Sequence, residues 1–125
     1  MRGFLTFLLL LAAADSYKLS MFYCGFSGDY CGQSIHDDVL PQTSLVILAF
    51  ANTLPDGTVV ADEDNFPGDL TAQWKRTGKQ IVLSVGGQNG NWAYVFASDD
   101  SISRFTDSLV KLVKKFKLDG VDLDV

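Results

Sequence analysis

The sequence has little positive charge, a single histidine and a short chain. Its 125 residues carry 10 Lys and Arg against 15 Asp and Glu, a formal net charge of −5. This balance offers no basic surface for phosphates and argues against nucleic-acid binding. The length excludes a complete eight-stranded α/β barrel, which needs roughly 200 residues or more. The sequence therefore predicts one globular domain or a piece of a larger one.

The longest hydrophobic run lies at the N-terminus. Met1-Arg2-Gly3 precedes a leucine-rich run over residues 4–11, and three alanines follow at 12–14. A short cationic start, an apolar run and an A-x-A site are typical of a secretory signal peptide. The run is shorter than the ~20 residues that cross a bilayer. A buried N-terminal helix or strand is the alternative, but it does not account for the order of these features. We predict a signal peptide over 1–14 and a secreted, extracellular mature part over 15–125 with no membrane segment.

Metal-binding residues and cysteines are scarce. His36 is the only histidine, and Cys24 and Cys31 do not form a C-x-x-C pair, so a zinc site is not expected. Secretion would expose both cysteines to an oxidising environment. They could bridge to each other or to cysteines outside this chain, and two cysteines alone do not decide the pairing.

Strand-like and helix-like segments alternate along the mature chain. Four apolar runs predict strands over 19–26, 44–51, 81–85 and 120–125. The run over 44–51 is apolar throughout, which favours burial on both faces of a parallel sheet. Helices are predicted around Leu70 and Trp74, from about residue 100 to 117, and briefly over 34–40, while 52–67 is expected to be irregular with a turn or small hairpin at 55–57. This order predicts an α/β fold with parallel strands.

The last predicted strand carries two carboxylates at alternate positions. Asp122 and Asp124 alternate with Val121, Leu123 and Val125. The strand period of two puts the carboxylates on one face and the apolar side chains against helices on the other. Buried carboxylates are unfavourable unless they are hydrogen-bonded, and such pairs are common in proton-transfer sites. A surface acidic strand or a cation site is the alternative, which the apolar neighbours disfavour.

Ser84, Gly86 and Gly87 lie at the carboxyl end of the preceding predicted strand. Ligands bind at the carboxyl ends of parallel strands, and glycine lets backbone or ligand approach closely. A simple glycine turn is the alternative. The glycines do not form the G-x-G-x-x-G pattern of a dinucleotide site.

Together, S-x-G-G at 84–87 and D-G-x-D-x-D at 119–124 resemble the motifs of glycoside hydrolase family 18, the chitinase family. That family closes its second motif with a glutamate, D-G-x-D-x-D-x-E. Here the motif is complete through Val125, and the sequence ends one residue before the catalytic glutamate is due. The resemblance spans the mature chain. It implies that residues 15–125 are a partial catalytic domain, the N-terminal half of a (β/α)8 TIM barrel with about four β/α units.

The resemblance also implies an activity and roles for particular residues. Family members hydrolyse β-1,4 bonds between N-acetylglucosamine units with retention, using the acetamide of the substrate as nucleophile. As catalytic residues, Asp124 would hydrogen-bond the acetamide and Asp122 would share a proton with Asp124. Ser84 would hydrogen-bond Asp122, while Asp119 and Gly120 would organise the start of the strand.

Other residues are expected to contact the sugar. Gly86 and Gly87 would leave space beside it, and Tyr23 would line the barrel lumen. Three aromatic residues near the strand ends could stack on a sugar face: Phe50, Trp92 and Tyr94. For Trp92 a packing role is an equal alternative, and for Phe50 core packing is the default. The expected partner is chitin or N-acetylglucosamine oligosaccharides, and no metal or organic cofactor is implied.

Three functional hypotheses follow. The preferred one is a chitinase whose 125 residues alone lack the acid glutamate and are inactive. The second is a non-catalytic, lectin-like carbohydrate-binding member of the same family. The third is an unrelated parallel α/β domain, which leaves the paired motifs unexplained.

Overall fold

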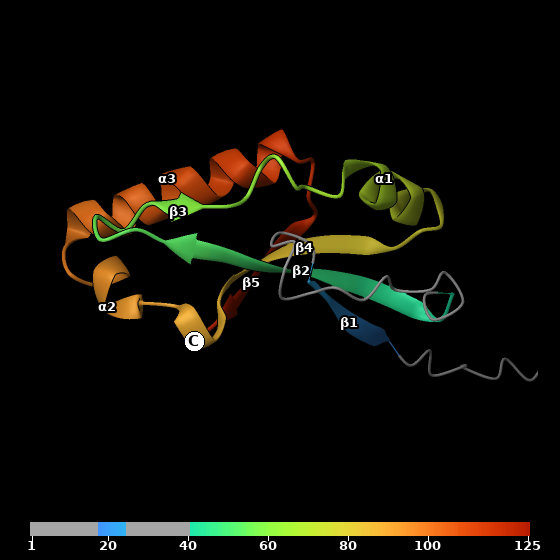
Figure 1. The fold of residues 1–125 in the computed structure, drawn as a ribbon, viewed down its shortest axis with the longest axis horizontal. Helices are drawn as coiled ribbons and strands as arrows, with labels where there is room; N and C mark the ends of the chain where they lie inside the picture. Colours follow the sequence, from blue (N-terminus) through green and yellow to red (C-terminus); the bar gives the residue numbers. More distant parts are fainter. Residues whose placement is uncertain (1–17, 25–40) are drawn as a thin grey trace, which may run out of the picture.

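The computed structural model describes residues 18–24 and 41–125 (Figure 1). The predicted signal peptide, the helix predicted over 34–40, Cys31 and His36 lie outside these residues. The described elements are β1 (Leu19–Cys24), β2 (Thr43–Thr53), β3 (Val59–Val60), α1 (Gly68–Arg76), β4 (Gln80–Gly86), the 3-10 helix η2 (Gly87–Asn89), α2 (Trp92–Val95), α3 (Asp99–Lys115) and β5 (Gly120–Asp124).

The four predicted strands form one parallel sheet in the order β1-β2-β4-β5. Each is within a few residues of its predicted range. β3 adds a short antiparallel pairing to β2. Consecutive parallel strands need a crossover, and α1, between β2 and β4, and α3, between β4 and β5, supply it. The predicted α/β class with a parallel sheet is confirmed.

The core lies between the sheet and its helices. Val46 of β2 pairs with Ile81 of β4, and Leu48 pairs with Leu83, so these side chains project from one face. All four are fully buried. The helices complete this cluster with Trp74 of α1 and with Leu109 and Leu112 of α3. Figure 1 shows α1, α3 and β3 together on one side of the sheet.

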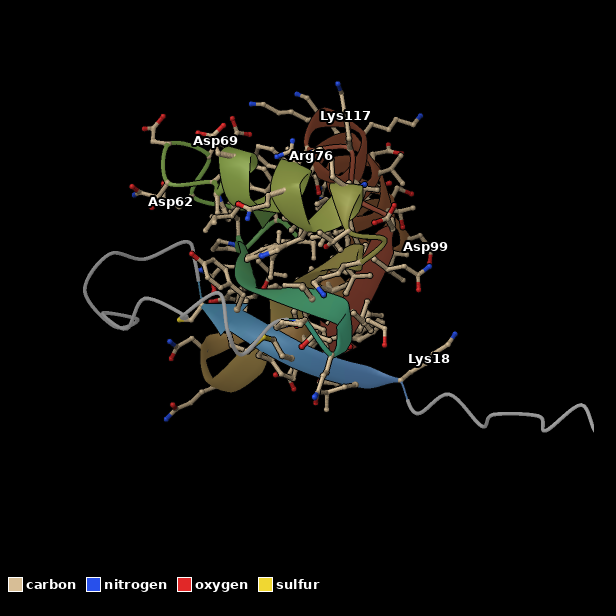
Figure 2. All side chains as sticks on the ribbon, turned by 90° about the vertical axis from the view of Figure 1, so that its right-hand side faces the viewer. Lys18, Asp62, Asp69, Arg76, Asp99 and Lys117 are labelled. Carbon is tan, nitrogen blue, oxygen red and sulfur yellow. The ribbon has the colours of Figure 1, made fainter. Side chains whose placement is uncertain are left out.

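The two main helices form close to their predicted positions, and α3 ends at Lys115, two residues before the predicted end. The Ser98 side chain accepts the backbone N–H of Ser101, and Ser101 Oγ accepts the N–H of Ser98, forming a reciprocal cap at the start of α3. After α1, Gly78 has a φ of +82°, as a helix C-terminal glycine requires. The charged residues labelled in Figure 2, among them Asp99 and Lys117, point outward from the fold.

The stretch predicted to be irregular contains a hairpin that packs on α3. The N–H of Leu54 donates to the carbonyl of Thr58, and the N–H of Gly57 donates back to Leu54. A Cβ at Gly57 would lie 2.6 Å from the carbonyl oxygen of Ser101, so only glycine allows this approach. The N–H of Thr58 donates to the carboxylate of Asp56 at the turn, which lowers the pKa of Asp56 below its ordinary 3.8.

The face predicted for Val121 and Leu123 of β5 is confirmed. Val121 and Leu123 do lie on the helix-facing side of the sheet, because they pair with Leu83 and Val85. Their side chains are nevertheless 44% and 49% exposed. The core residues of α3 pack over β2, β3 and β4, so no described helix covers the edge strand β5.

Candidate active site

The carboxyl ends of β4 and β5 bring the two predicted motifs together. Ser84 pairs with Asp122, and Gly86 pairs with Asp124, in the parallel register of the two strands. Side chains alternate along a strand, so Ser84, Asp122 and Asp124 share the face opposite the helices. The structure therefore places both carboxylates and the serine in one cluster, at the end of the sheet where ligands bind in such folds.

Asp122 is held by a hydrogen bond from Ser84. The hydroxyl of Ser84 donates to Oδ2 of Asp122 at 2.7 Å, and Ser84 itself is fully buried. Hydrogen bonds to charged groups stabilise a protein more than neutral ones do, and this bond offsets part of the cost of burying the carboxylate. Asp122 therefore has a defined orientation before any ligand arrives.

The Asp124 carboxylate differs from that of Asp122 in its hydrogen bonding. Asp124 is half-buried, and within the described residues its carboxylate has no hydrogen-bond or ion-pair partner. Among the described residues, one carboxylate of the pair therefore has a protein donor and the other has none.

Gly86 and Gly87 allow close packing of protein against protein. Gly86 has a φ of +112°, and a Cβ there would lie 2.2 Å from the carbonyl oxygen of Asp124. Gly87 has a φ of +72°, and its Cβ would lie 3.2 Å from the ring of Phe50. The predicted space beside a sugar is therefore taken up at Gly86 by Asp124 and Trp92 and at Gly87 by Phe50.

Trp92, at the start of α2, makes a hydrogen bond and two aromatic contacts within the protein. Its indole N–H donates to the backbone carbonyl of Asp124 at 3.1 Å. Its ring lies 6.2 Å from that of Phe96 and 5.9 Å from that of Phe105, between centroids. Of the two roles weighed for Trp92, these contacts favour packing over sugar stacking.

The prediction for Tyr23 was wrong. Tyr23 pairs with Leu48, whose side chain is in the core, and its ring meets that of Trp74 edge-on at 5.1 Å. It therefore faces the helices. Phe22, one residue earlier, has the opposite orientation and is 54% exposed. The strand is short and carries an aromatic residue on each face, so its residue pattern did not decide between Phe22 and Tyr23.

Phe50 joins Phe22 on the site face. Strict alternation from Leu48 would put Phe50 on the helix side, but the pairing of β2 with β4 shifts register between Leu48 and Ala51. The Ala49–Phe50 peptide is cis. The rings of Phe22 and Phe50 lie 6.1 Å apart between centroids. The structure thus adds Phe22, which the sequence did not single out, beside Phe50 on the site face.

Asp119 acts at the other end of the strands. Its Oδ2 accepts the N–H of Ile81 at 2.8 Å, its Oδ1 accepts Nζ of Lys75 at 3.0 Å, and its own N–H donates to the Ile81 carbonyl at 2.7 Å. These bonds tie the start of β5 to β4. A Cβ at Gly120 would lie 3.6 Å from Val82, an ordinary contact, so sterics do not require glycine there.

The described residues contain no group of three His, Cys, Asp or Glu side chains that could hold a metal ion. Cys24 at the end of β1 is disulfide-bonded. The other cysteine of the sequence, Cys31, lies outside the described residues. None of the described helices has both the length and the apolar character needed to cross a bilayer.

Comparisons with known proteins point to one family. A sequence profile described as "Glycosyl hydrolases family 18" matches residues 19–125. Endochitinase 4 of Metarhizium anisopliae is 29% identical over 89 residues, which cover 66% of this chain and 30% of that protein. The crystal structure of a chitinase from Rhizomucor miehei is 30% identical with a TM-score of 0.69, over 86% of this chain and 33% of that one.

The fold is shared with more distant proteins. A class V chitinase variant from Nicotiana tobaccum, solved in complex with NAG4, is 21% identical with a TM-score of 0.66, over 84% of this chain and 31% of that one. The present chain thus spans about a third of the length of each of these three chitinases.

Proposed function

The chain belongs to glycosyl hydrolase family 18, and we propose that it is the N-terminal part of a chitinase catalytic domain. In this proposal β1, β2, β4 and β5 are four of the eight strands of a TIM barrel. The parallel order β1-β2-β4-β5 and the match to about a third of each solved chitinase support it. The face that carries Ser84, Asp122 and Asp124 is then the barrel lumen.

The proposed activity of the whole protein is hydrolysis of β-1,4-linked N-acetylglucosamine polymers. The observation that carries this proposal is the pair of unlike carboxylates: Asp122 fixed by Ser84, and Asp124 open beside it on the same face. An acetamide N–H can donate to the Asp124 carboxylate. Phe22 and Phe50 offer an apolar surface on the same face, suited to the carbon face of a sugar ring.

The proposed mechanism is substrate-assisted and retaining. The carbonyl oxygen of the acetamide forms a bond to the anomeric carbon, the bond from that carbon to the leaving oxygen breaks, and an acid protonates the leaving oxygen. Asp124 orients the acetamide and stabilises the positive charge that develops on it, and Asp122 supports Asp124. Water then opens the cyclic intermediate and restores the starting anomer.

The acid is the part of the mechanism that residues 1–125 do not supply. In this proposal the acid is the glutamate that closes the family motif D-G-x-D-x-D-x-E, which would stand directly after Val125. We expect the 125 residues alone to be inactive for this reason. We further propose that residues 1–14 direct the protein to secretion and that its extracellular partner is chitin or its oligosaccharides.

The test uses the protein expressed from its complete coding sequence, with tetra-N-acetylchitotetraose as substrate. We expect hydrolysis that yields the β-anomer first, detected by proton NMR. The Asp124→Asn variant should lose activity by about a hundredfold or more, on the order of one removed transition-state interaction. Asp107→Asn, an exposed residue of α3, is the matched control and should retain activity.

The outcomes separate the hypotheses. Binding of the oligosaccharide without hydrolysis by the wild type would favour the lectin-like alternative. If the wild type neither binds nor hydrolyses the oligosaccharide, the assignment of this face as a chitin site is overturned. An Asp124→Asn variant as active as Asp107→Asn would overturn the role of Asp124.

A further inference from the structure

β4 pairs with β5 along the whole of β5, and this pairing ends at Gly86 and Asp124. At Gly86 the chain turns into η2 with a φ of +112° and leaves the sheet. Beyond this point β4 can offer no further backbone donor to β5. Figure 1 shows the end of the chain beside the segment that runs from β4 through η2 to α2.

Trp92 supplies a donor at this point. Its indole Nε1 lies 3.1 Å from the backbone carbonyl oxygen of Asp124. A Cβ at Gly86 would lie 3.1 Å from both Nε1 and Cζ2 of the indole, so the ring passes directly over Gly86. Phe105 of α3 and Phe96, in the turn before α3, pack on the indole. The donor is therefore held in place by packing before it meets its acceptor.

We propose that Trp92 is a positioning residue that sets the location of the Asp124 carboxylate by fixing the Asp124 backbone. This inference rests on the proposed function. Asp122 receives a side-chain hydrogen bond from Ser84, whereas the Asp124 carboxylate has no partner within the described residues. Within the described residues, the hydrogen bond that bears on the position of Asp124 is the one from Trp92 to its backbone carbonyl. The same peptide unit leads to Val125 and to the residue that would follow it.

The consequence for catalysis is specific. A reacting group displaced by about 1 Å can lower the rate by about a hundredfold, because the geometry of attack is lost. Release of the Asp124 carbonyl should therefore lower kcat. KM should change little, because the sugar contacts made by the rest of the site remain.

The decisive experiment removes the N–H and keeps the ring. In the protein expressed from its complete coding sequence, Trp92 is replaced by β-(3-benzothienyl)alanine, in which sulfur takes the place of the indole N–H. The matched control is the same replacement at Trp74. That residue is 4% exposed and packs on Tyr23, and its indole N–H donates no hydrogen bond within the described residues.

With tetra-N-acetylchitotetraose as substrate, we expect kcat to fall by about tenfold or more at position 92, with KM within about twofold of wild type. The replacement at Trp74 should leave both constants unchanged. Trp92→Phe, which also loses the N–H, should show the same kcat loss. Equal kcat for the two benzothienyl variants, or a loss confined to KM or to thermal stability, would overturn the positioning role.

A second measurement separates this inference from the proposed function. The exchange of the Trp92 indole hydrogen with solvent, followed by NMR, should be at least about tenfold slower than that of an exposed indole. The carbonyl carbon shift of Asp124 should change in the position-92 variant and not in the position-74 variant. If the wild type does not hydrolyse the tetramer, the proposed function fails, while these two readouts still decide whether Trp92 holds Asp124. Fast indole exchange and an unchanged Asp124 shift would refute it.

Discussion

Replacing Gly86 by alanine tests most directly how the site is assembled. The backbone at Gly86 has φ +112° and ψ −112°, a region that residues with a Cβ rarely adopt. Strain of this kind costs about 1–3 kcal/mol. The added Cβ would also lie 2.2 Å from the carbonyl oxygen of Asp124, so the ends of β4 and β5 must move apart by about 1 Å.

That movement breaks the hydrogen bond from Trp92 to Asp124, which contributes about 0.5–1.5 kcal/mol. The two effects together lower the free energy of unfolding by about 2–4 kcal/mol. Because Asp124 carries the proposed catalytic carboxylate, hydrolysis of tetra-N-acetylchitotetraose should fall by about a hundredfold in the molecules that remain folded. Urea denaturation measures the free energy of unfolding. The rate of hydrolysis is measured without urea, at a temperature well below the unfolding transition.

Gly78→Ala is the matched control for this prediction. Gly78 also has a positive φ, +82°, but a Cβ there meets nothing within 4 Å. We expect a loss of about 1–2 kcal/mol from the left-handed backbone and no change in kcat. The reasoning is refuted if the two alanine variants lose the same stability, or if Gly86→Ala turns over substrate at the wild-type rate.

Two further predictions concern the supporting hydrogen bonds. Ser84→Ala removes the donor to Asp122, so turnover should show a kcat lower by about tenfold, and urea denaturation a free energy of unfolding lower by about 1–3 kcal/mol. An unchanged kcat would contradict the role of Ser84. Asp119→Ala removes the acceptor of the Ile81 N–H and the partner of Lys75, and should cost about 1–3 kcal/mol of stability with KM unchanged. Asp119→Asn keeps an acceptor for Ile81 and should cost less, so equal losses in the two variants would argue against that hydrogen bond as the cause.

The strands and the main helices were predictable because the residue patterns that indicate them lie within short segments. The same holds for the two motifs, which the sequence shows directly. The apolar runs that became β2 and β4 reflect burial on both faces of a parallel sheet. The helix α3 follows from an apolar stripe with acidic residues at its start and lysines at its end. The alternation in β5 correctly grouped Asp122 with Asp124 on one face, because the strand period is two wherever the strand is regular.

The features that the sequence did not decide all depend on neighbours in space. Tyr23 and Phe22 are adjacent aromatic residues in one apolar strand, and only the pairing of β1 with β2 decides that Tyr23 faces α1. Phe50 reaches the site face through a register shift that no residue pattern announces. Val121 and Leu123 have the predicted orientation, but their exposure within the described residues depends on where the helices pack.

The sequence by itself determined the α/β class, the order of the elements and the residue types at the site, since these depend on periodicity and spacing within short segments. Only the tertiary structure decided how Asp122 and Asp124 differ. Ser84 reaches Asp122 from a neighbouring strand, and Trp92 reaches the Asp124 backbone from a helix 32 positions away in the chain. Contacts between distant segments depend on sheet register and on the turn at Gly86, which bring together groups that the sequence keeps apart.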